Sequence, residues 1–146
     1  MNVVFKIADY FDIEEIVKLC NECFEENTLV IDAQRNFLKT KSDKNQIYLI
    51  GIVDGLIVAH TKITIIPMFF DKVRTYAILN HVCVKKEYRR HNIATKMLIE
   101  CERICKGLDC NEMKLWSMNF RIPAHECYKN FGFEINDAKF FSKKID

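Results

Sequence analysis

The chain has 146 residues, of which 49% are hydrophobic and 29% are charged, and its formal net charge is only +2. This balance is typical of one soluble globular domain with a sizeable core, which we expect residues 1–146 to form. The small net charge provides no general attraction to nucleic acid or to a membrane. The seven cysteines form no paired framework, and we find neither a secretory leader nor a membrane-spanning run. We therefore expect a reduced, cytoplasmic protein.

The N-terminal region predicts a strand followed by two helices. Apolar residues recur every three or four positions between residues 13 and 24, which indicates an amphipathic helix. Cys20 and Cys23 lie inside it with the spacing of a metal-binding or redox pair. No second Cys/His pair follows at zinc-finger distance, so we interpret them as buried thiols without a metal. The expected elements are a strand at 3–8, helices at 13–24 and 31–41, and a loop at 25–30.

The middle of the chain reads as three strands. Residues 46–53 are strongly β-forming, and the Asp54-Gly55 pair that follows is a strong hairpin signal. We expect the return strand at 56–66, a connection with an apolar patch at 67–72, and a third strand at 74–84. Because these strands are joined by short turns, this part of the sheet should be antiparallel.

The C-terminal half predicts one parallel crossover. We expect a helix from residue 93 that ends at Gly107, and a strand at 114–118 with Leu115 and Trp116 at its centre. A short helix at 124–130 and a final hairpin at 134–137 and 139–143 should follow. The predicted fold class is α+β, with a mixed, mostly antiparallel sheet flanked by helices around a central βαβ unit.

The turn between the third strand and its helix has the features of a phosphate site. The first turn of a helix has unpaired N–H groups and a partial positive charge, so it attracts anions. Arg89 and Arg90 are placed to add charge-assisted hydrogen bonds.

Two motifs in this half match one known family. Residues 89–94, RRHNIA, fit the form Q/R-x-x-G-x-G/A, except that Asn92 replaces the first glycine. Asn is the non-glycine residue that best tolerates a left-handed backbone. Residues 124–133, AHECYKNFGF, fit A-x-x-x-Y-x-x-x-G-F. In this order and spacing the two motifs resemble those of the GNAT superfamily of N-acetyltransferases.

The resemblance implies that acetyl-coenzyme A is the co-substrate and that no metal is used. The diphosphate would bind the amides of residues 90–95, and the pantetheine arm would pair with the backbone of residues 82–84. The cofactor-binding residues implied in this way are Val82, Cys83, Val84, Arg89, Arg90, His91, Asn92, Ile93, Ala94, Thr95, Arg121 and His125. Many relatives have an Asn where this chain has Arg121.

The resemblance also implies direct acetyl transfer to a primary amine, with Tyr128 as the general acid that protonates the leaving thiolate. A phenol is a neutral donor at pH 7, which suits this role. Many relatives carry a glutamate base before the central turn, whereas this chain offers only Asn80 and His81 there. Strand alternation places them on opposite faces, so only one of them should point into the cleft. His81 is the candidate base, and Asn80 is a candidate for positioning water or amine.

Several alternatives remain at this stage. The protein could be an acyl-coenzyme A sensor without catalysis, which Asn92 and the missing glutamate favour and Tyr128 opposes. Nucleic-acid binding lacks a second basic surface or an aromatic platform. The acceptor, a small-molecule or protein amine, has no readable code, although Glu25 and Glu26 are placed to attract a cationic amine. A homodimer could use the apolar residues 68–70 or 140–141.

Overall fold

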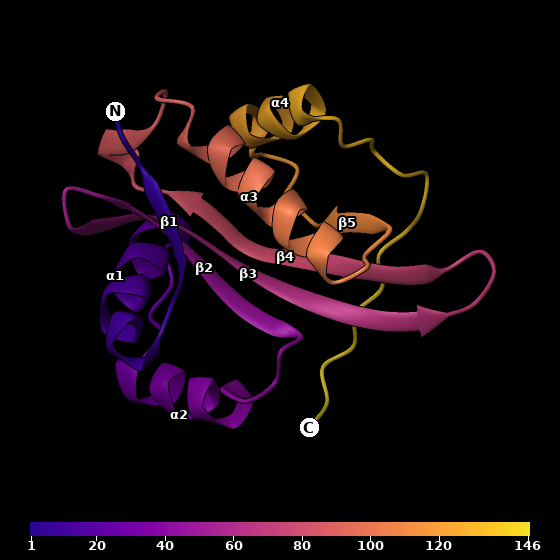
Figure 1. Ribbon diagram of the computed structural model, residues 1–146, viewed down its shortest axis with the longest axis horizontal. Coiled ribbons are helices and arrows are strands. Elements are labelled where there is room, and N and C mark those ends of the chain that lie inside the picture. The colour runs from indigo at the N-terminus through magenta and orange to yellow at the C-terminus, as the bar shows by residue number, and fades with distance from the viewer. The chain divides into compact units, whose positions relative to one another are not determined.

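The computed structural model describes residues 1–146, which divide into two compact units, 1–116 and 117–146. The elements in chain order are β1 (Val4–Ile7), a 3-10 helix (Tyr10–Asp12), α1 (Ile13–Phe24), α2 (Val30–Thr40), β2 (Gln46–Val53), β3 (Leu56–Phe69), β4 (Arg74–Val84), a second 3-10 helix (Lys86–Tyr88), α3 (Ile93–Gly107), β5 (Glu112–Leu115) and α4 (Ile122–Phe131) (Figure 1). The sheet and α1 to α3 belong to the first unit, and α4 belongs to the second. That all 146 residues form one domain stays a prediction.

The five strands form one sheet in the order β1-β2-β3-β4-β5. The first four pair antiparallel, and β5 pairs parallel to β4 after the α3 crossover. The predicted fold class, a mixed and mostly antiparallel sheet with a central βαβ unit, is therefore confirmed. The bounds of β2 and β4 agree with the sequence prediction to the residue, because a tight turn or a polar segment delimits each strand.

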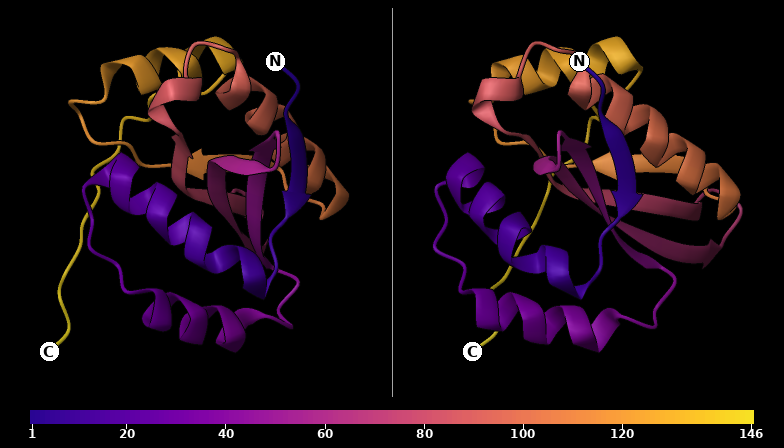
Figure 2. Two further views of the ribbon diagram at one scale, coloured as in Figure 1. Left: turned by 90° about the vertical axis from the view of Figure 1, so that its left-hand side faces the viewer. Right: turned by 60° about the vertical axis from the view of Figure 1, so that its left-hand side comes forward.

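Helices cover both faces of the sheet in the first unit. Figures 1 and 2 show α1 and α2 on one face and α3 on the other. Against the first face, α1 and α2 bury a cluster that includes Ile16, Phe37 and Ile50. On the other face, α3 buries residues at helical spacing: Ile93, Met97, Leu98, Cys101 and Cys105. The sheet is thus covered by helices on both faces, and β4 is held between these two layers.

Strand β3 runs three residues further than predicted. Pro67 was expected to begin a connection, but the strand continues through it to Phe69, which pairs with Arg74. The register shifts between Ile66 and Phe69. At such an irregularity a proline costs little, because its missing N–H is not needed for the ladder.

The end of the chain differs from the sequence prediction in two places. Strand β5 lies at Glu112–Leu115 rather than 114–118, and Trp116 is 53% exposed beyond it instead of central. The predicted final hairpin is wrong, since no strand follows α4. Phe140 and Phe141 are 68% and 84% exposed. Short apolar alternation does not form a strand unless a partner strand and a buried face are present.

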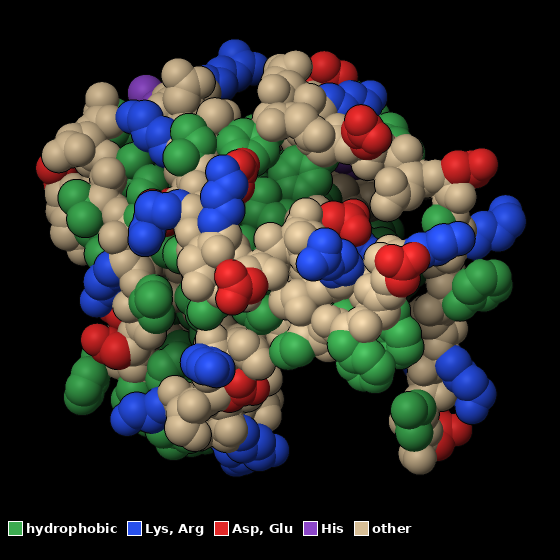
Figure 3. Space-filling model, turned by 45° about the vertical axis from the view of Figure 1, so that its right-hand side comes forward, with side chains coloured by type: hydrophobic (Ala, Val, Ile, Leu, Met, Phe, Trp, Pro, Cys, Tyr) green, Lys and Arg blue, Asp and Glu red, His purple; other side chains and the backbone are tan.

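No helix is long and apolar enough to cross a membrane. On the face drawn in Figure 3, basic and acidic side chains are interspersed instead of gathering by sign. The charge pattern of that face therefore matches the small net charge of the chain.

Candidate active site

Strand β4 has an unpaired edge over its last five residues. Its pairing with β5 covers only Tyr76 to Leu79, whereas its pairing with β3 continues to Val84. On the β5 side, the backbone of residues 80–84 has no strand partner. An extended ligand with amide groups could add to such an edge as a further strand does. The predicted contact of the pantetheine arm with Val82, Cys83 and Val84 falls on this segment.

A β-bulge interrupts the same strand at His81. Lys62 pairs with Asn80 and His60 pairs with Cys83, so that Thr61 alone opposes two residues of β4. His81 has a φ of +50°, in the left-handed region that non-glycine residues rarely adopt. The backbone thus takes one extra residue at this point.

The bulge corrects the alternation expected from the sequence. Simple alternation would place Asn80 and Cys83 on opposite faces, but their register partners Lys62 and His60 are two residues apart on β3 and share one face. Asn80 and His81 consequently both line one pocket on the α1 side. The prediction that only one of them could point into a cleft was wrong, because the bulge shifts the alternation by one residue.

Two side chains of β3 hold the bulge in place. The buried His60 Nδ1 lies 3.0 Å from the His81 carbonyl oxygen and donates to it. The Thr61 hydroxyl, also buried, donates to the carbonyl oxygen of Asn80 over 3.2 Å. These two bonds connect the backbone of the bulge to buried side chains of the neighbouring strand.

The pocket beside the bulge has a volume of about 180 Å³. It is lined by Ile16, Val17, Cys20, Glu26, Thr28, Tyr48, His60, Lys62, Asn80 and His81. His81 Nε2 lies 2.9 Å from Glu26 Oε1, and the ring of Phe24 packs edge-on against the imidazole with centroids 4.7 Å apart. The pocket therefore combines apolar side chains with one acidic group, one lysine and two imidazoles, of which His81 is paired with the acid.

The loop after α1 sets the position of Glu26. The Asn21 side chain accepts from the backbone N–H of Thr28 and donates to its carbonyl oxygen, at 3.0 and 3.1 Å. The N–H of Glu26 itself donates to the carbonyl oxygen of Asn21 over 3.1 Å. Asn21 thus closes the loop so that Glu26 meets His81. The sequence suggested Glu26 only as an attractor for cations, and no sequence signal paired it with His81, 55 positions away.

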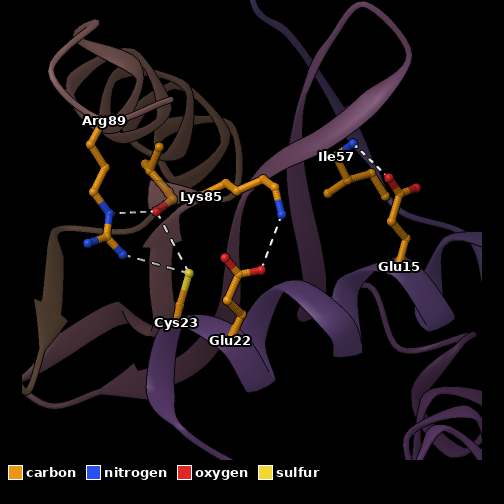
Figure 4. A network of polar contacts seen from close by, with 7 residues as sticks. Glu15, Glu22, Cys23, Ile57, Lys85 and Arg89 are labelled. Carbon is orange, nitrogen blue, oxygen red and sulfur yellow. Dashed lines mark hydrogen bonds and ion pairs between the residues drawn. The ribbon is translucent and has the colours of Figure 1, made fainter. Parts of the chain in front are cut away.

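A larger hollow of about 510 Å³ lies elsewhere, between α1 and the β2–β3 hairpin. Its polar groups already have partners, as Figure 4 shows: Glu15 accepts from the N–H of Ile57 over 3.1 Å, and Glu22 pairs with Lys85 over 3.2 Å. None of the predicted site residues lines it. These pairs connect α1 to β3 and to the end of β4, so we assign the hollow a structural role.

The turn before α3 adopts the backbone that the glycine motif requires. Arg90 and Asn92 have φ values of +65° and +60°. The Asn92 side chain makes no capping hydrogen bond, and Lys96 N–H is the donor to the Asn92 carbonyl, at 3.0 Å. The amides of Ile93 and Ala94 therefore precede the first helical hydrogen bond and are suited to an anion. Thr95 belongs to the same first turn.

Arg89 points differently from the sequence expectation of a phosphate ligand. Its Nε donates to the Val84 carbonyl oxygen over 2.9 Å, and its Nη2 lies 3.9 Å from Cys23 Sγ (Figure 4). The Arg89 guanidinium thus bridges the end of β4 and α1. Arg90 is exposed, and His91 Nδ1 donates to the Tyr88 carbonyl oxygen over 3.3 Å.

The second unit contains the remaining predicted residues. In α4, His125 Nε2 lies 3.1 Å from both Ser117 Oγ and the Met118 carbonyl oxygen, which connects the helix to the segment before it. Tyr128 is half-buried, and its ring packs edge-on against Phe133 with centroids 5.8 Å apart. Arg121 is the residue before α4.

The glycine of the second motif has a conformational role. Gly132 ends α4 with a φ of +117°, and its N–H donates to the carbonyl oxygens of Tyr128 and Lys129. A side chain would be strained at this φ. The chain then turns back so that Phe133 reaches Tyr128, which explains why a Gly-Phe pair follows the tyrosine at this spacing.

Comparison with known proteins identifies the family. The sequence model of the acetyltransferase (GNAT) family matches residues 13–133, and a search of curated proteins gave no significant match. Because the match covers most of the chain, the protein belongs to the GNAT acetyltransferase family.

Solved structures show the same fold at low identity. A transcriptional regulator from Bacillus halodurans superposes with a TM-score of 0.89 at 18% identity, covering 99% of this chain and 100% of that one. The aminoglycoside antibiotic 6′-N-acetyltransferase from Acinetobacter haemolyticus has a TM-score of 0.78 at 21% identity, covering 100% of both chains. A protein from Clostridium acetobutylicum, described as a predicted acetyltransferase and solved with acetyl-CoA, has a TM-score of 0.79 at 19% identity, covering 97% of this chain and 96% of that one. These likenesses establish the fold.

The left-handed backbone at Asn92 leads to a stability prediction. We expect Asn92→Ala to lower the free energy of unfolding by ~1 kcal/mol, because a left-handed residue with a Cβ costs roughly 1–2 kcal/mol and Asn relieves part of that cost. Asn92→Gly should leave stability unchanged or raise it. Urea unfolding measures the free energy of unfolding of both variants. The control is Lys96→Ala, an exposed position on the same helix, whose free energy of unfolding should lie within ~0.5 kcal/mol of the wild-type value. Equal stability of the Ala and Gly variants would contradict the assignment.

Proposed function

We propose that the protein transfers the acetyl group of acetyl-coenzyme A directly to a primary amine. The observation that carries the proposal is the unpaired edge of β4 at residues 80–84, which leads into the left-handed turn at Asn92 and the start of α3. The edge suits the amide groups of a pantetheine arm, and the helix start suits a diphosphate. The proposed cofactor contacts are the backbone of residues 82–84 and the turn from Arg90 to Thr95. Arg89, Arg121 and His125 stay predicted contacts.

In the proposed reaction, the amine nitrogen attacks the acetyl carbonyl carbon. The new C–N bond forms as the C–S bond breaks, and the electron pair leaves on the coenzyme A sulfur. Tyr128 donates its phenolic proton to that thiolate. The proton lost by the amine passes to His81, directly or through a water held by Asn80.

Glu26 determines which nitrogen of His81 acts in this proposal. With Nε2–H donating to Glu26 Oε1 over 2.9 Å, the lone pair of the neutral ring lies on Nδ1, which becomes the proton acceptor. The carboxylate also stabilises the imidazolium that forms. This dyad replaces the glutamate that many relatives carry on the strand.

The pocket beside His81 is our candidate for the acceptor site, and its small volume suits an amine-bearing side arm of a small molecule or of a protein. Glu26 supplies negative charge for a cationic amine, and Lys62, which lies over the Tyr48 ring at 5.3 Å, limits that attraction. A cytoplasmic location, where acetyl-coenzyme A is available, is part of the proposal.

The test of this function begins with thermal unfolding with and without acetyl-coenzyme A. A saturating ligand stabilises the native state, so we expect a rise in Tm of ~5 °C or more at a hundredfold excess over Kd. A free-thiol assay over aminoglycosides, polyamines and lysine peptides should then show release with one amine class. Binding without thiol release would favour the acyl-coenzyme A sensor, and an unchanged Tm would contradict both functions.

Removing the proposed general acid gives a second prediction. Tyr128→Phe should lower kcat by ~10²–10⁴, because general-acid catalysis typically contributes this much. The Kd for acetyl-coenzyme A, measured by calorimetry, should change little because the ring remains. The matched control is Tyr76→Phe, on β4 outside the open edge. Wild-type kcat in Tyr128→Phe would remove Tyr128 from the mechanism.

The proposed base predicts a pH effect. A protonated imidazole accepts no proton, so a histidine base loses its role as the pH falls. The kcat/KM of the wild type divided by that of His81→Gln should therefore rise from acid to neutral pH. Titration of the amine substrate affects both proteins equally, so it cancels in this ratio. Glu26→Gln should lower kcat by ~10-fold. Because this variant keeps His81, its kcat/KM should keep the pH dependence of the wild type. A ratio that stays constant with pH would exclude His81 as the base.

A further inference from the structure

Three thiols and one imidazole meet in the core of residues 1–116, behind the bulge of β4. Cys20 and Cys23 lie one turn apart on the same face of α1, while His60 on β3 pairs in register with Cys83 on β4. One ligand atom from each of Cys20, His60 and Cys83 lies within 4.8 Å of the other two, and all three side chains are buried. None of these side chains takes part in the proposed proton transfers, although Cys20 and His60 line the proposed acceptor pocket.

Cys23 completes the cluster from its more open side. Hydrogen-bonding contacts connect the Cys83 thiol to both Cys20 and Cys23. Cys23 is half-buried, with its Sγ 3.7 Å from the Val84 carbonyl oxygen and 3.9 Å from the Arg89 guanidinium (Figure 4). Cys23 lies outside the group of three ligand atoms that are mutually within 4.8 Å, but its contact with Cys83 offers a fourth, partly accessible sulfur through which an ion could enter.

The spacing fits a tetrahedral ion. With Zn–S and Zn–N bonds of ~2.3 and ~2.0 Å, the S···N edge of a tetrahedron is ~3.5 Å and the S···S edge is ~3.8 Å. Cys20 Sγ lies 3.6 Å from His60 Nδ1, already at such an edge. The 4.8 Å limit on the other two pairs among Cys20, His60 and Cys83 leaves shifts of ~1 Å, which rotamer adjustments can supply. Cys23 must in addition turn its sulfur toward these three ligands.

Hydrogen bonding within the cluster shifts the pKa values of its three thiols in opposite directions. Hydrogen bonding from Cys83, and then from His60, lowers the pKa of Cys20 to about 5. Hydrogen bonding from Cys83 likewise lowers the pKa of Cys23 to about 7, assisted by Arg89. Burial instead raises the pKa of Cys101 to about 12. The same hydrogen bonds, with Cys20 and then with Cys23, raise the pKa of Cys83, so without a cation the three thiols share protons and do not all ionise. It is therefore the geometry of the cluster that favours an ion.

His60 faces the cluster through Nδ1. Its side chain is 3% exposed, and Nδ1 lies 3.6 Å from the Cys20 sulfur and 3.0 Å from the His81 carbonyl oxygen. An ion at Nδ1 would shift the ring proton to Nε2, which has no hydrogen-bond partner in this structure. The metal–ligand bonds must therefore outweigh that cost and the lost bond to the His81 carbonyl oxygen.

We infer that Cys20, Cys23, Cys83 and His60 form a binding site for one Zn²⁺ ion or a similar thiophilic divalent cation. Four protein ligands leave no open coordination position, so the site is structural and not catalytic. Three thiolates and a neutral imidazole around Zn²⁺ leave a net charge of −1, and Arg89 lies next to it. The ion would connect α1 to β3 and β4 directly behind His81.

The experiment is a Co²⁺ titration of the full chain, purified without metal under a phosphine reductant that excludes disulfides. We expect one equivalent to produce a near-ultraviolet sulfur-to-cobalt charge-transfer band and the visible bands of tetrahedral Co²⁺, and Zn²⁺ to abolish both. Cys23→Ser and Cys20→Ser should each weaken Co²⁺ binding by ~100-fold or more. Losing a residue that only supports a ligand already costs ~10–100-fold in metal affinity, and losing a ligand itself should cost at least as much. The charge-transfer intensity should fall as each sulfur is removed.

The matched control is Cys110→Ser, because Cys110 lies in hydrogen-bonding contact with Cys105 but belongs to no histidine-containing cluster. It should bind Co²⁺ as wild type does. Circular dichroism shows whether each variant folds. If Cys20→Ser does not fold, the Co²⁺ affinity of Cys23→Ser, a substitution at a half-buried position, tests the proposal. No charge-transfer band in the folded wild type, or equal Co²⁺ affinity of Cys23→Ser and Cys110→Ser, overturns the proposal.

Discussion

The candidate site depends on the pair of side-chain hydrogen bonds that holds the bulge at His81. A non-glycine residue in the left-handed region costs roughly 1–3 kcal/mol. The bonds from His60 Nδ1 and Thr61 Oγ1 to the two bulge carbonyls are each worth ~1 kcal/mol net, which is of the same size. The bulge is therefore stable only because β3 presents polar side chains at those two positions.

This local distortion sets the geometry on both sides of β4. On the α1 side it directs Asn80 and His81 into one pocket, where Glu26 meets the imidazole. On the side toward β5, the parallel pairing ends at Leu79, two residues before the bulge at His81. The strand thus changes from a paired core element to an open edge at the same point at which its side chains change face. The open edge and the pocket that we propose for the acceptor therefore lie on the same stretch of β4.

Much of the fold was readable from the sequence because local and tertiary preferences agree there. The Asp54-Gly55 turn and the β-branched runs fix β2 and β4, and the left-handed backbone at Asn92 follows from the residue types that tolerate it. The bulge was not readable, since His81 carries no turn chemistry and its φ of +50° is imposed by partners on β3. The contact between His81 and Glu26 was equally hidden, because the Asn21 side chain creates it by closing a loop. The predicted hairpin at 134–137 and 139–143 was wrong for the opposite reason: its apolar alternation favours strands locally, but no partner strand is present.

The cysteine cluster shows how a weak sequence signal can change its meaning in three dimensions. On α1 alone, Cys20 and Cys23 read as buried thiols, because no second Cys/His pair follows nearby. The sheet supplies that pair from His60 and Cys83, two residues that are adjacent in register and 23 positions apart in sequence. His60 belongs to both arrangements, since Nδ1 faces the His81 carbonyl oxygen and the Cys20 sulfur. An ion bound at this imidazole would compete with the bond that stabilises the bulge, so occupancy of the cluster and the position of His81 would be thermodynamically linked.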